Sequence, residues 1–441
     1  MFPNPLTEYF MKRKLVPLCL CVMAFNSQSG FAQDEVSLGE QNVVTFQEFA
    51  NEVQLRNPEL RLYEKEIDAA KGGRRQAGIY ENPQMSSQFG GSRVSGGGLS
   101  EEGTAWSVSV LQTFEYPGRM ELRKAIANQD VRLAELGLQQ FRVALKAQAI
   151  VVGFRLLSAQ RKAEAGQDVA ERLQELSEVM VRRDPAGVAP LIELQIVKSA
   201  VVVFRKKSIE ASEELQSAHF EANLLRGKPL ATPLKITSES IALPRPPSIP
   251  VLLEAAQKNS FGIQMRQVEL KQQDLSVKLR RNERWPEISV GPFVSQQDDA
   301  GSETIAGIGL SLPLPFWNRN AGNIEMAQSR AVQAETSLKL VQLRVEQSVM
   351  EHALAYQLRL QELSKWGNDA LDSFREAAEL GDRHYRLGSL PIGTYMELQR
   401  EYLDAVESIV DLQSEAVEAR EQLQVMTGLS HESWILEKML Q

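Results

Sequence analysis

Metal-ligating and nucleophilic side chains are few in this sequence, and their spacing does not build a reactive site. The four histidines stand far apart in the chain: His219, His352, His384 and His431. His352 follows Glu351, but adjacent residues on a helix point in different directions and do not form a metal pair. The sequence contains no Walker loop, nucleophile elbow or HExxH motif. We therefore expect no catalytic residue, no metal site, no cofactor and no enzymatic activity.

Two carboxylates recur in a pattern. Glu193 lies in "IELQ" and Glu397 in "MELQ", and each follows a turn that carries a glycine and a proline. Such turns stop one helix and start the next. A repeated acid beside a turn can be a functional charge or an ordinary solvated charge on a helix surface, and the sequence leaves both interpretations open.

The first 32 residues predict a secretory signal peptide. From Met11, a possible start, three cations precede an apolar run, and small residues suit cleavage after Ala32. Cys19 and Cys21, the only cysteines, lie in this run, and neither follows the small residue that lipid attachment favours. We expect an exported, unlipidated mature chain without cysteine, stabilised by packing or oligomerisation.

Length and charge narrow the class of protein further. The 441 residues suffice for two or three domains or one elongated assembly. A net charge of −8 and the lack of a basic block disfavour a nucleic-acid partner. After the signal, no apolar stretch approaches the roughly 20 residues of a membrane helix. If the chain enters a membrane, we expect it to do so as strands.

The chain repeats one plan at an interval of about 200 residues. Residues 49–85 resemble residues 252–288, and "LLRG" and "VMTG" end the two copies. Each copy predicts a helix, two strands, a very long helix, a turn and a long helix. The expected divisions are a signal peptide (1–32), a first repeat (33–227, strand pair about 84–115), a proline-rich linker (228–250), a second repeat (251–428, strand pair about 286–314) and a tail (429–441).

The predicted strands alternate apolar residues with small or polar ones. Ile308, Leu310 and Leu312, for example, alternate with Gly307, Gly309 and Ser311. Strands of about ten residues with this alternation are typical of membrane β-barrels. A small soluble sandwich is the alternative, but it does not explain why each strand pair sits between helices.

The predicted long helix runs from about Arg119 to Arg183, which corresponds to roughly 100 Å. Two apolar stripes with three-and-four spacing run between Val131 and Ala163. Two stripes predict neighbours on both sides, as in a bundle or a closed ring of helices.

These features resemble the TolC-like outer-membrane efflux family over essentially the whole mature chain. "NPEL" (57–60), "YRLGSLP" (385–391) and "LPLPFWNRNAGNI" (312–324) are similar to family segments, and the last is most similar to the cobalt–zinc–cadmium resistance branch. The resemblance implies a mixed fold, a membrane β-barrel joined to a long α-helical coiled-coil barrel. It also implies a homotrimer, in which four strands per chain make a twelve-stranded barrel.

The implied function is a passive exit duct in the outer membrane of a Gram-negative bacterium, with the helical part in the periplasm. The implied partners are outer-membrane lipid, a periplasmic adaptor and an inner-membrane resistance–nodulation–division transporter that supplies the energy. Heavy-metal cations are the expected cargo. The alternatives are the same duct serving antibiotics, dyes or type I secretion, and a periplasmic coiled-coil adaptor or scaffold.

The resemblance also assigns three groups of residues. The tips that contact the adaptor are Gly187, Val188, Leu387, Gly388 and Ser389. The residues assigned to the periplasmic aperture are Glu193, Glu397, Arg383 and Tyr385. Thr394 stands where some relatives carry Asp, which implies a weaker acidic ring. The residues assigned to the interfacial aromatic belt are Phe114, Tyr116, Phe316 and Trp317. An ordinary helix–helix turn remains the alternative for the tips.

Overall fold

The computed structural model describes residues 43–96, 99–183, 191–237, 243–298, 301–366 and 369–430, together with Trp434. The predicted signal peptide lies outside the described residues. The strands are β1 (Val43–Val44), β2 (Gln84–Gly96), β3 (Leu99–Phe114), β4 (Lys235–Ile236), β5 (Ile288–Asp298) and β6 (Ser302–Ser311). The helices are α1 (Phe46–Arg56), α2 (Leu60–Gln76), α3 (Arg119–Arg183), α4 (Leu191–Leu225), α5 (Ile249–Asn259), α6 (Phe261–Asn282), α7 (Ala321–Leu363), α8 (Ala370–Arg386) and α9 (Ile392–Thr427).

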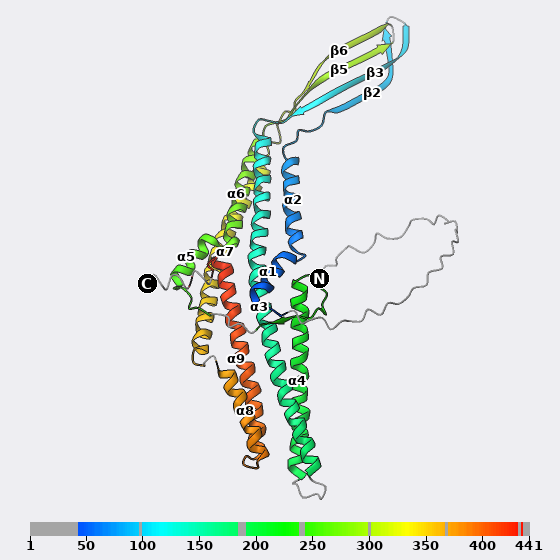
Figure 1. Cartoon of the computed structure of the whole chain (residues 1–441). Helices are drawn as coiled ribbons and strands as arrows, with labels where there is room; N and C mark the ends of the chain where they lie inside the picture. The colour runs from blue at the N-terminus through cyan, green and yellow to red at the C-terminus, as the bar shows by residue number, and fades with distance from the viewer. Residues whose placement is uncertain are drawn as a thin grey trace, which may run out of the picture. The chain divides into compact units, whose positions relative to one another are not determined.

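Four strands form one antiparallel sheet in the order β2-β3-β5-β6 (Figure 1). The register places Val108 opposite Val294, and Val294 opposite Ala306. Because side chains alternate between faces, one face of the sheet is apolar. It carries Met85, Phe89, Trp106, Val108, Val110, Phe114, Ile288, Val290, Val294, Ile308 and Leu310.

The opposite face of the sheet is small and polar. Hydroxyl pairs join neighbouring strands there: the Oγ atoms of Ser86 and Ser109 lie 2.8 Å apart, and Thr113 Oγ1 lies 3.0 Å from Ser289 Oγ. Gly291 on this face is needed for close approach, since a Cβ there would lie 1.8 Å from the Val110 carbonyl oxygen. This face also carries Leu111, Phe293 and Ile305, so the sheet has one apolar face and one face that is mostly small and polar.

The long helix α3 spans 65 residues with the bounds expected from the sequence. It packs against α4, α9, α6 and α2, and α7 packs against α6 and α9 (Figure 1). This confirms the neighbours on both sides that its two apolar stripes predict. Among the described helices, none combines the length and the hydropathy needed to cross a bilayer.

The second copy differs from the first at its long helix. α7 ends at Leu363 and α8 begins at Ala370, so the expected very long helix is interrupted. The interval includes Gly367 and Asn368, two poor helix formers that lie outside the described residues. Trp366 before the interval packs against Phe374 after it, with ring centroids 6.1 Å apart.

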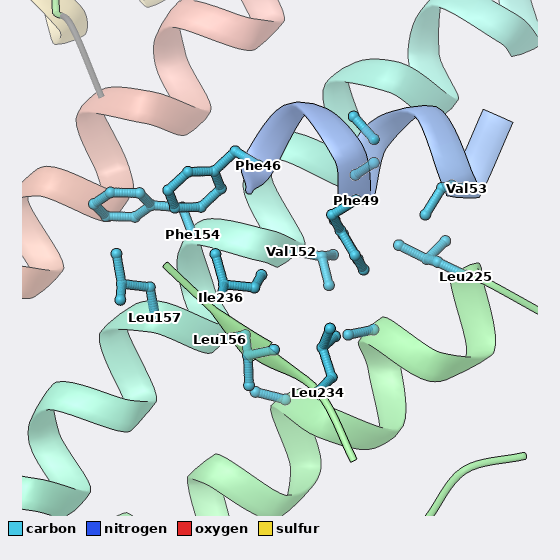
Figure 2. Packing of buried hydrophobic residues seen from close by; sticks show 14 of the residues in the cluster. Phe46, Phe49, Val53, Val152, Phe154, Leu156, Leu157, Leu225, Leu234 and Ile236 are labelled. Atoms are coloured by element: carbon cyan, nitrogen blue, oxygen red, sulfur yellow. The ribbon is translucent and has the colours of Figure 1, made fainter. Parts of the chain in front are cut away.

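A hydrophobic core forms where α1 and β4 lie against α3 (Figure 2). Phe49 of α1, Val152 of α3 and Ile236 of β4 are buried together. Leu234 and Ile236 belong to the segment expected to be an extended linker, and β4 pairs in parallel with β1. Part of the linker is thus packed into the core of the helical region.

The ends of α4 and α9 are capped by the same hydrogen bond. Asn57 Nδ2 donates to the Leu225 carbonyl at 3.1 Å, and Asn259 Nδ2 donates to the Thr427 carbonyl at 2.8 Å; each bond spans 168 residues. A glycine with positive φ follows each helix, Gly227 at 64° and Gly428 at 67°. The two halves of the chain therefore close their last helices in the same way.

An ionic cluster joins α1 to the end of α4. Glu52 Oε2 accepts from Arg226 Nε at 2.8 Å, and Glu52 Oε1 lies 2.5 Å from Lys228 Nζ. The side chain of Arg226 is 1 % exposed and also donates to Asn223 Oδ1 at 3.1 Å. The carboxylate of Glu52 is thus a principal counter-charge for a buried guanidinium.

Replacing Glu52 with glutamine is expected to lower the free energy of unfolding by about 1–3 kcal/mol at pH 7, because Arg226 loses its carboxylate partner. Partial burial raises the pKa of Glu52, but the hydrogen bonds from Lys228 and Arg226 outweigh it and hold this pKa below its ordinary value of 4.5. Since the folded-state pKa is depressed, this stabilisation is complete above that ordinary value and disappears as the pH falls through the folded-state pKa.

Thermal melting of both proteins from neutral to acidic pH measures the difference. The gap between wild type and Glu52→Gln should begin to narrow as the pH falls below about 4.5 and should close once the pH lies below the folded-state pKa of Glu52. Glu66→Gln, which changes an exposed carboxylate on α2, is the control and should show little effect. A gap that persists unchanged at low pH would contradict the assignment.

Candidate functional site

The turn between α8 and α9 is a preformed tip. The Ser389 amide donates to the His384 carbonyl at 3.0 Å, and the Gly388 amide donates to the Tyr385 carbonyl at 2.9 Å. This pair of bonds is a Schellman motif, which requires a left-handed residue, and Gly388 has φ 77°. Pro391 then precedes the first residue of α9. The turn holds Leu387 in the open, with 80 % of its surface exposed.

Aromatic and ionic contacts just behind the turn hold α8 and α9 together. The rings of Tyr385 and Tyr395 stack with centroids 4.9 Å apart. The Tyr395 hydroxyl donates to Asp382 Oδ1 at 2.9 Å, and Arg386 Nε donates to Asp382 Oδ2 at 2.7 Å. Burial raises the pKa of the Tyr395 hydroxyl well above its ordinary value, and the Asp382 carboxylate raises it further. Tyr395 therefore remains a neutral donor at physiological pH.

The expected aperture residues are only partly brought together within one chain. Burial raises the pKa of the Tyr385 hydroxyl, and the negative charge of the Glu193 carboxylate raises this pKa further. Arg383 instead pairs with Glu379 on its own helix at 4.0 Å. Glu397 is exposed, whereas Gln399, two residues on and on the other side of α9, is buried and donates to the Ala378 carbonyl at 2.9 Å.

The other expected tip, at Gly187 and Val188, lies outside the described residues. Ser389 of the described tip is held by its own hydrogen bonds: its Oγ donates to the His384 carbonyl at 2.9 Å and lies 3.1 Å from His384 Nδ1. The hydroxyl group thus reinforces the turn, while Leu387 and Gly388 form its outer surface.

The aromatic residues expected at a membrane interface all lie where strands give way to helices. Phe114 ends β3, Tyr116 precedes α3, and Phe316 and Trp317 lie between β6 and α7. Trp317 is 96 % exposed and packs edge-on against Phe316. Trp285 was not among the expected belt residues, but its ring stacks on Tyr116 with centroids 5.5 Å apart. Its position in a Trp-Pro pair shortly before β5 was the available signal.

A buried arginine that was not expected from the sequence connects the start of α3 with the segment between α6 and β5. Arg119, the first residue of α3, donates from Nη2 to the Trp285 carbonyl at 2.7 Å and from Nε to Asn282 Oδ1 at 3.2 Å. Its Nη1 lies 2.5 Å from Glu287 Oε1. Asn282 Nδ2 in turn donates to the Pro117 carbonyl at 2.9 Å. This network fixes the angle between the sheet and the helices.

Both junctions use a left-handed residue to turn the chain into a helix. Gly118, before α3, has φ 85°, and Asn320, before α7, has φ 60°. Asn320 is stabilised by donating from Nδ2 to the Arg280 carbonyl at 2.8 Å. Each junction is therefore locked to the end of α6.

Metal ligation has little support in the part of the chain that the structure describes. No group of three or more His, Cys, Asp and Glu side chains there is arranged to hold a metal ion. His219 is half-buried, and burial lowers the pKa of its imidazole. His431 lies outside the described residues.

Comparison with known proteins places the second half of the chain in a family. Residues 252–429 match the family described as Outer membrane efflux protein. The chain is also similar to the cobalt-zinc-cadmium resistance protein CzcC of Cupriavidus metallidurans, with 26 % identity over 336 residues that cover 74 % of this chain and 78 % of that protein.

Solved structures share the fold of most of this chain. The Campylobacter jejuni CmeC outer membrane channel matches with a TM-score of 0.69 and 14 % identity, covering 89 % of this chain and 88 % of that one. The outer membrane protein VceC of Vibrio cholerae matches with a TM-score of 0.64 and 15 % identity, covering 87 % and 96 %.

Replacing Gly388 with alanine is expected to destabilise the tip by about 1–2 kcal/mol, because a Cβ is disfavoured at positive φ. The matched control is Gly393→Ala in the first turn of α9, where a Cβ meets open space and alanine should stabilise the helix by about 0.5–1 kcal/mol. Hydrogen exchange of the α8 amides measures both effects. Equal effects at the two glycines would contradict the strained turn.

Proposed function

We propose that this chain is a TolC-like outer-membrane efflux protein, not an enzyme, and that it serves as the exit duct of a tripartite resistance–nodulation–division efflux system. The duct is passive, and the inner-membrane transporter supplies the energy. The sheet lies in the outer membrane and the helices extend into the periplasm. The observation that carries this proposal is the continuity between a one-sided apolar sheet and a helix of 65 residues.

Membrane insertion of the sheet is supported by its exposed apolar face. Met85, Phe89, Ile308 and Leu310 are each more than two-thirds exposed in the single chain. A soluble protein rarely presents such a continuous apolar surface, whereas lipid covers it without cost. The opposite face, lined by serine hydroxyls and glycines, then faces an aqueous lumen.

The two open edges of the sheet support assembly with further copies, and the TolC-like resemblance favours three copies. β2 and β6 each pair on one side only within the described chain. An unpaired strand edge in lipid costs several kcal/mol for each backbone group, so the edges must pair with other copies. Four strands are too few to close a barrel, and three copies supply twelve. Since β2 and β6 run in opposite directions in the sheet, β6 of one copy can pair with β2 of the next in the same antiparallel pattern.

Exposed apolar stripes on two helices support lateral association of the same copies. One follows α4 at three-and-four spacing, and the other follows α7. Their members are Ile192, Ile196, Val203, Phe220 and Leu224 on α4, and Leu340, Leu343, Met350, Leu354 and Leu358 on α7. The first half of α4 lies at the level of α8, and only its end lies level with the last turns of α7. Neighbouring copies that pack side by side therefore cover the two stripes at different levels as the helices close into a tube.

We also interpret the chain as a tandem repeat of residues 33–227 and 251–428, joined by residues 228–250. The repeated helix caps at Asn57 and Asn259 and the two antiparallel hairpins support this interpretation. Each repeat supplies one hairpin to the barrel and one antiparallel helix pair to the tube. Residues 1–32 act as the signal peptide, and the tail from residue 429 includes Trp434, which packs near Tyr356 with centroids 6.0 Å apart.

The adaptor binds at the tips formed by Gly187, Val188, Leu387, Gly388 and Ser389. The exposed Leu387 on a rigid turn supports this, because a preformed apolar knob needs little ordering when it docks. Glu193, Glu397, Arg383 and Tyr385 lie behind the tips, where three copies would bring their charges around one aperture. Carboxylates in such a ring attract cations.

Heavy-metal cations are the cargo favoured by the similarity to the cobalt-zinc-cadmium resistance protein. Deleting the gene should sensitise the host to cobalt, zinc or cadmium, with little change for dyes and antibiotics, and plasmid-borne wild type should restore resistance. Sensitivity confined to dyes and antibiotics would support the other branch of the same duct. Recovery of the protein in the soluble periplasm would contradict the duct itself.

Replacing Leu387 with aspartate should abolish resistance while the trimer remains intact, because a charge at the tip prevents apolar docking. Leu387→Met keeps an apolar side chain of similar size and is the matched control. Resistance of the complemented deletion strain and the heat-modifiable trimer on gels are the two measurements. Full resistance with aspartate at this position would exclude the tip contact.

Replacing Glu397 with glutamine should reduce the preference of the channel for cations, because each trimer loses three negative charges at its aperture. Single-channel recording at low salt measures the reversal potential. Arg400→Gln, a neighbouring exposed charge of opposite sign, is the control and should not reduce cation preference. Unchanged selectivity in Glu397→Gln would show that this residue is an ordinary solvated charge on a helix surface.

A further inference from the structure

The strand–helix junction of the second repeat carries exposed arginines that form no ion pair among the described residues. Arg281 lies in the last turn of α6, Arg284 lies between α6 and β5, and Arg319 lies between β6 and α7. All three are exposed, and none of the ion pairs among the described residues includes them. Their neighbours Arg119, Arg123 and Arg280 are instead paired with Glu287, Glu115 and Glu283.

Helix stabilisation does not explain this group. A cation near a helix C-terminus interacts favourably with the helix dipole, which accounts for Arg281 and for Arg74 and Arg75 at the end of α2. Arg284 and Arg319, however, lie outside any helix. Three exposed acids, Glu81, Glu121 and Glu325, occur near the junctions, and no ion pair among the described residues joins them to the group.

Each unpaired arginine of the loops lies beside an exposed aromatic residue. Arg284 directly precedes Trp285, and Arg319 follows Trp317 by two positions. Both tryptophans lie at the end of the apolar face of the sheet, at the level where its last strand residues give way to helix. Tryptophan is favoured at the headgroup level of a bilayer, and guanidinium groups bind phosphate with two hydrogen bonds.

We propose that Arg281, Arg284 and Arg319, with Trp285 and Trp317, form a site for the phosphate headgroups of anionic phospholipids in the leaflet nearest the helices. The inference rests on the proposed membrane location of the sheet. The tryptophan rings fix the depth of the junction in the bilayer, and the arginines hold the lipid phosphates against it. The site anchors the boundary at which the sheet becomes the helical tube.

The test uses the purified full-length protein in neutral detergent, with phosphatidylglycerol or phosphatidylcholine added. Phosphatidylglycerol should raise the melting temperature of the wild type more than phosphatidylcholine does, and salt should weaken the difference. Each arginine near a membrane surface contributes about fivefold to lipid affinity. Arg281→Gln/Arg284→Gln/Arg319→Gln should therefore need roughly a hundredfold more phosphatidylglycerol for the same shift.

Two further variants keep the result specific. The triple lysine variant retains the charge and should retain most of the preference for the anionic lipid. Arg61→Gln/Arg344→Gln/Arg400→Gln removes three exposed arginines from helices away from the junction and should behave as wild type. Equal preference in wild type and in the junction variant, or equal loss in the control, would overturn the inference while leaving the duct intact. A wild type that neither lipid stabilises would contradict the membrane location and the inference with it.

Discussion

The unpaired edges of the four-stranded sheet are the constraint on which the rest of the structure depends. The apolar face of this sheet suits lipid, but a bilayer offers no hydrogen bonds to the free edges of β2 and β6. The single chain therefore cannot be the inserted form. In the assembly that we propose, further copies close these edges and the helices that follow the strands form a ring, in which the exposed stripes on α4 and α7 become lateral contacts.

The second requirement is a rigid change from strand to helix. Extended strands must become helices within a few residues, and irregular backbone needs internal partners. Arg119 satisfies the Trp285 carbonyl and bonds Asn282, which in turn satisfies the Pro117 carbonyl. Asn320 bonds the Arg280 carbonyl at the other junction. Each junction depends on α6, so the orientation of one hairpin is linked to that of the other.

Local patterns in the sequence predict much of this architecture. The spacing of apolar residues gives α3 its correct bounds, and alternation identifies the two faces of the strands. The glycine and proline at 388 and 391 mark the tip because positive φ and a missing amide donor act locally. Contacts distant in sequence could not be predicted in this way. The pairing of β1 with β4, the Glu52–Arg226 cluster and the Arg119 network join residues that no periodicity relates.

The candidate site likewise combines features that local sequence patterns predict with contacts that they do not. The sequence identifies the exposed tip but not the stacked Tyr385 and Tyr395 behind it. The charges that we propose for the aperture would share one location only in the proposed assembly of several copies. The central claim is that several copies assemble by pairing β6 of one copy with β2 of the next. Disulfide cross-linking tests this claim directly, because the mature chain is predicted to lack cysteine. One cysteine replaces Gln88 in β2, and a second is moved along β6 through Ile305, Gly307 and Gly309. Oxidation of outer membranes should give covalent trimers at one matching register. Cross-links absent at every register, with the strands still protected from protease, would contradict it.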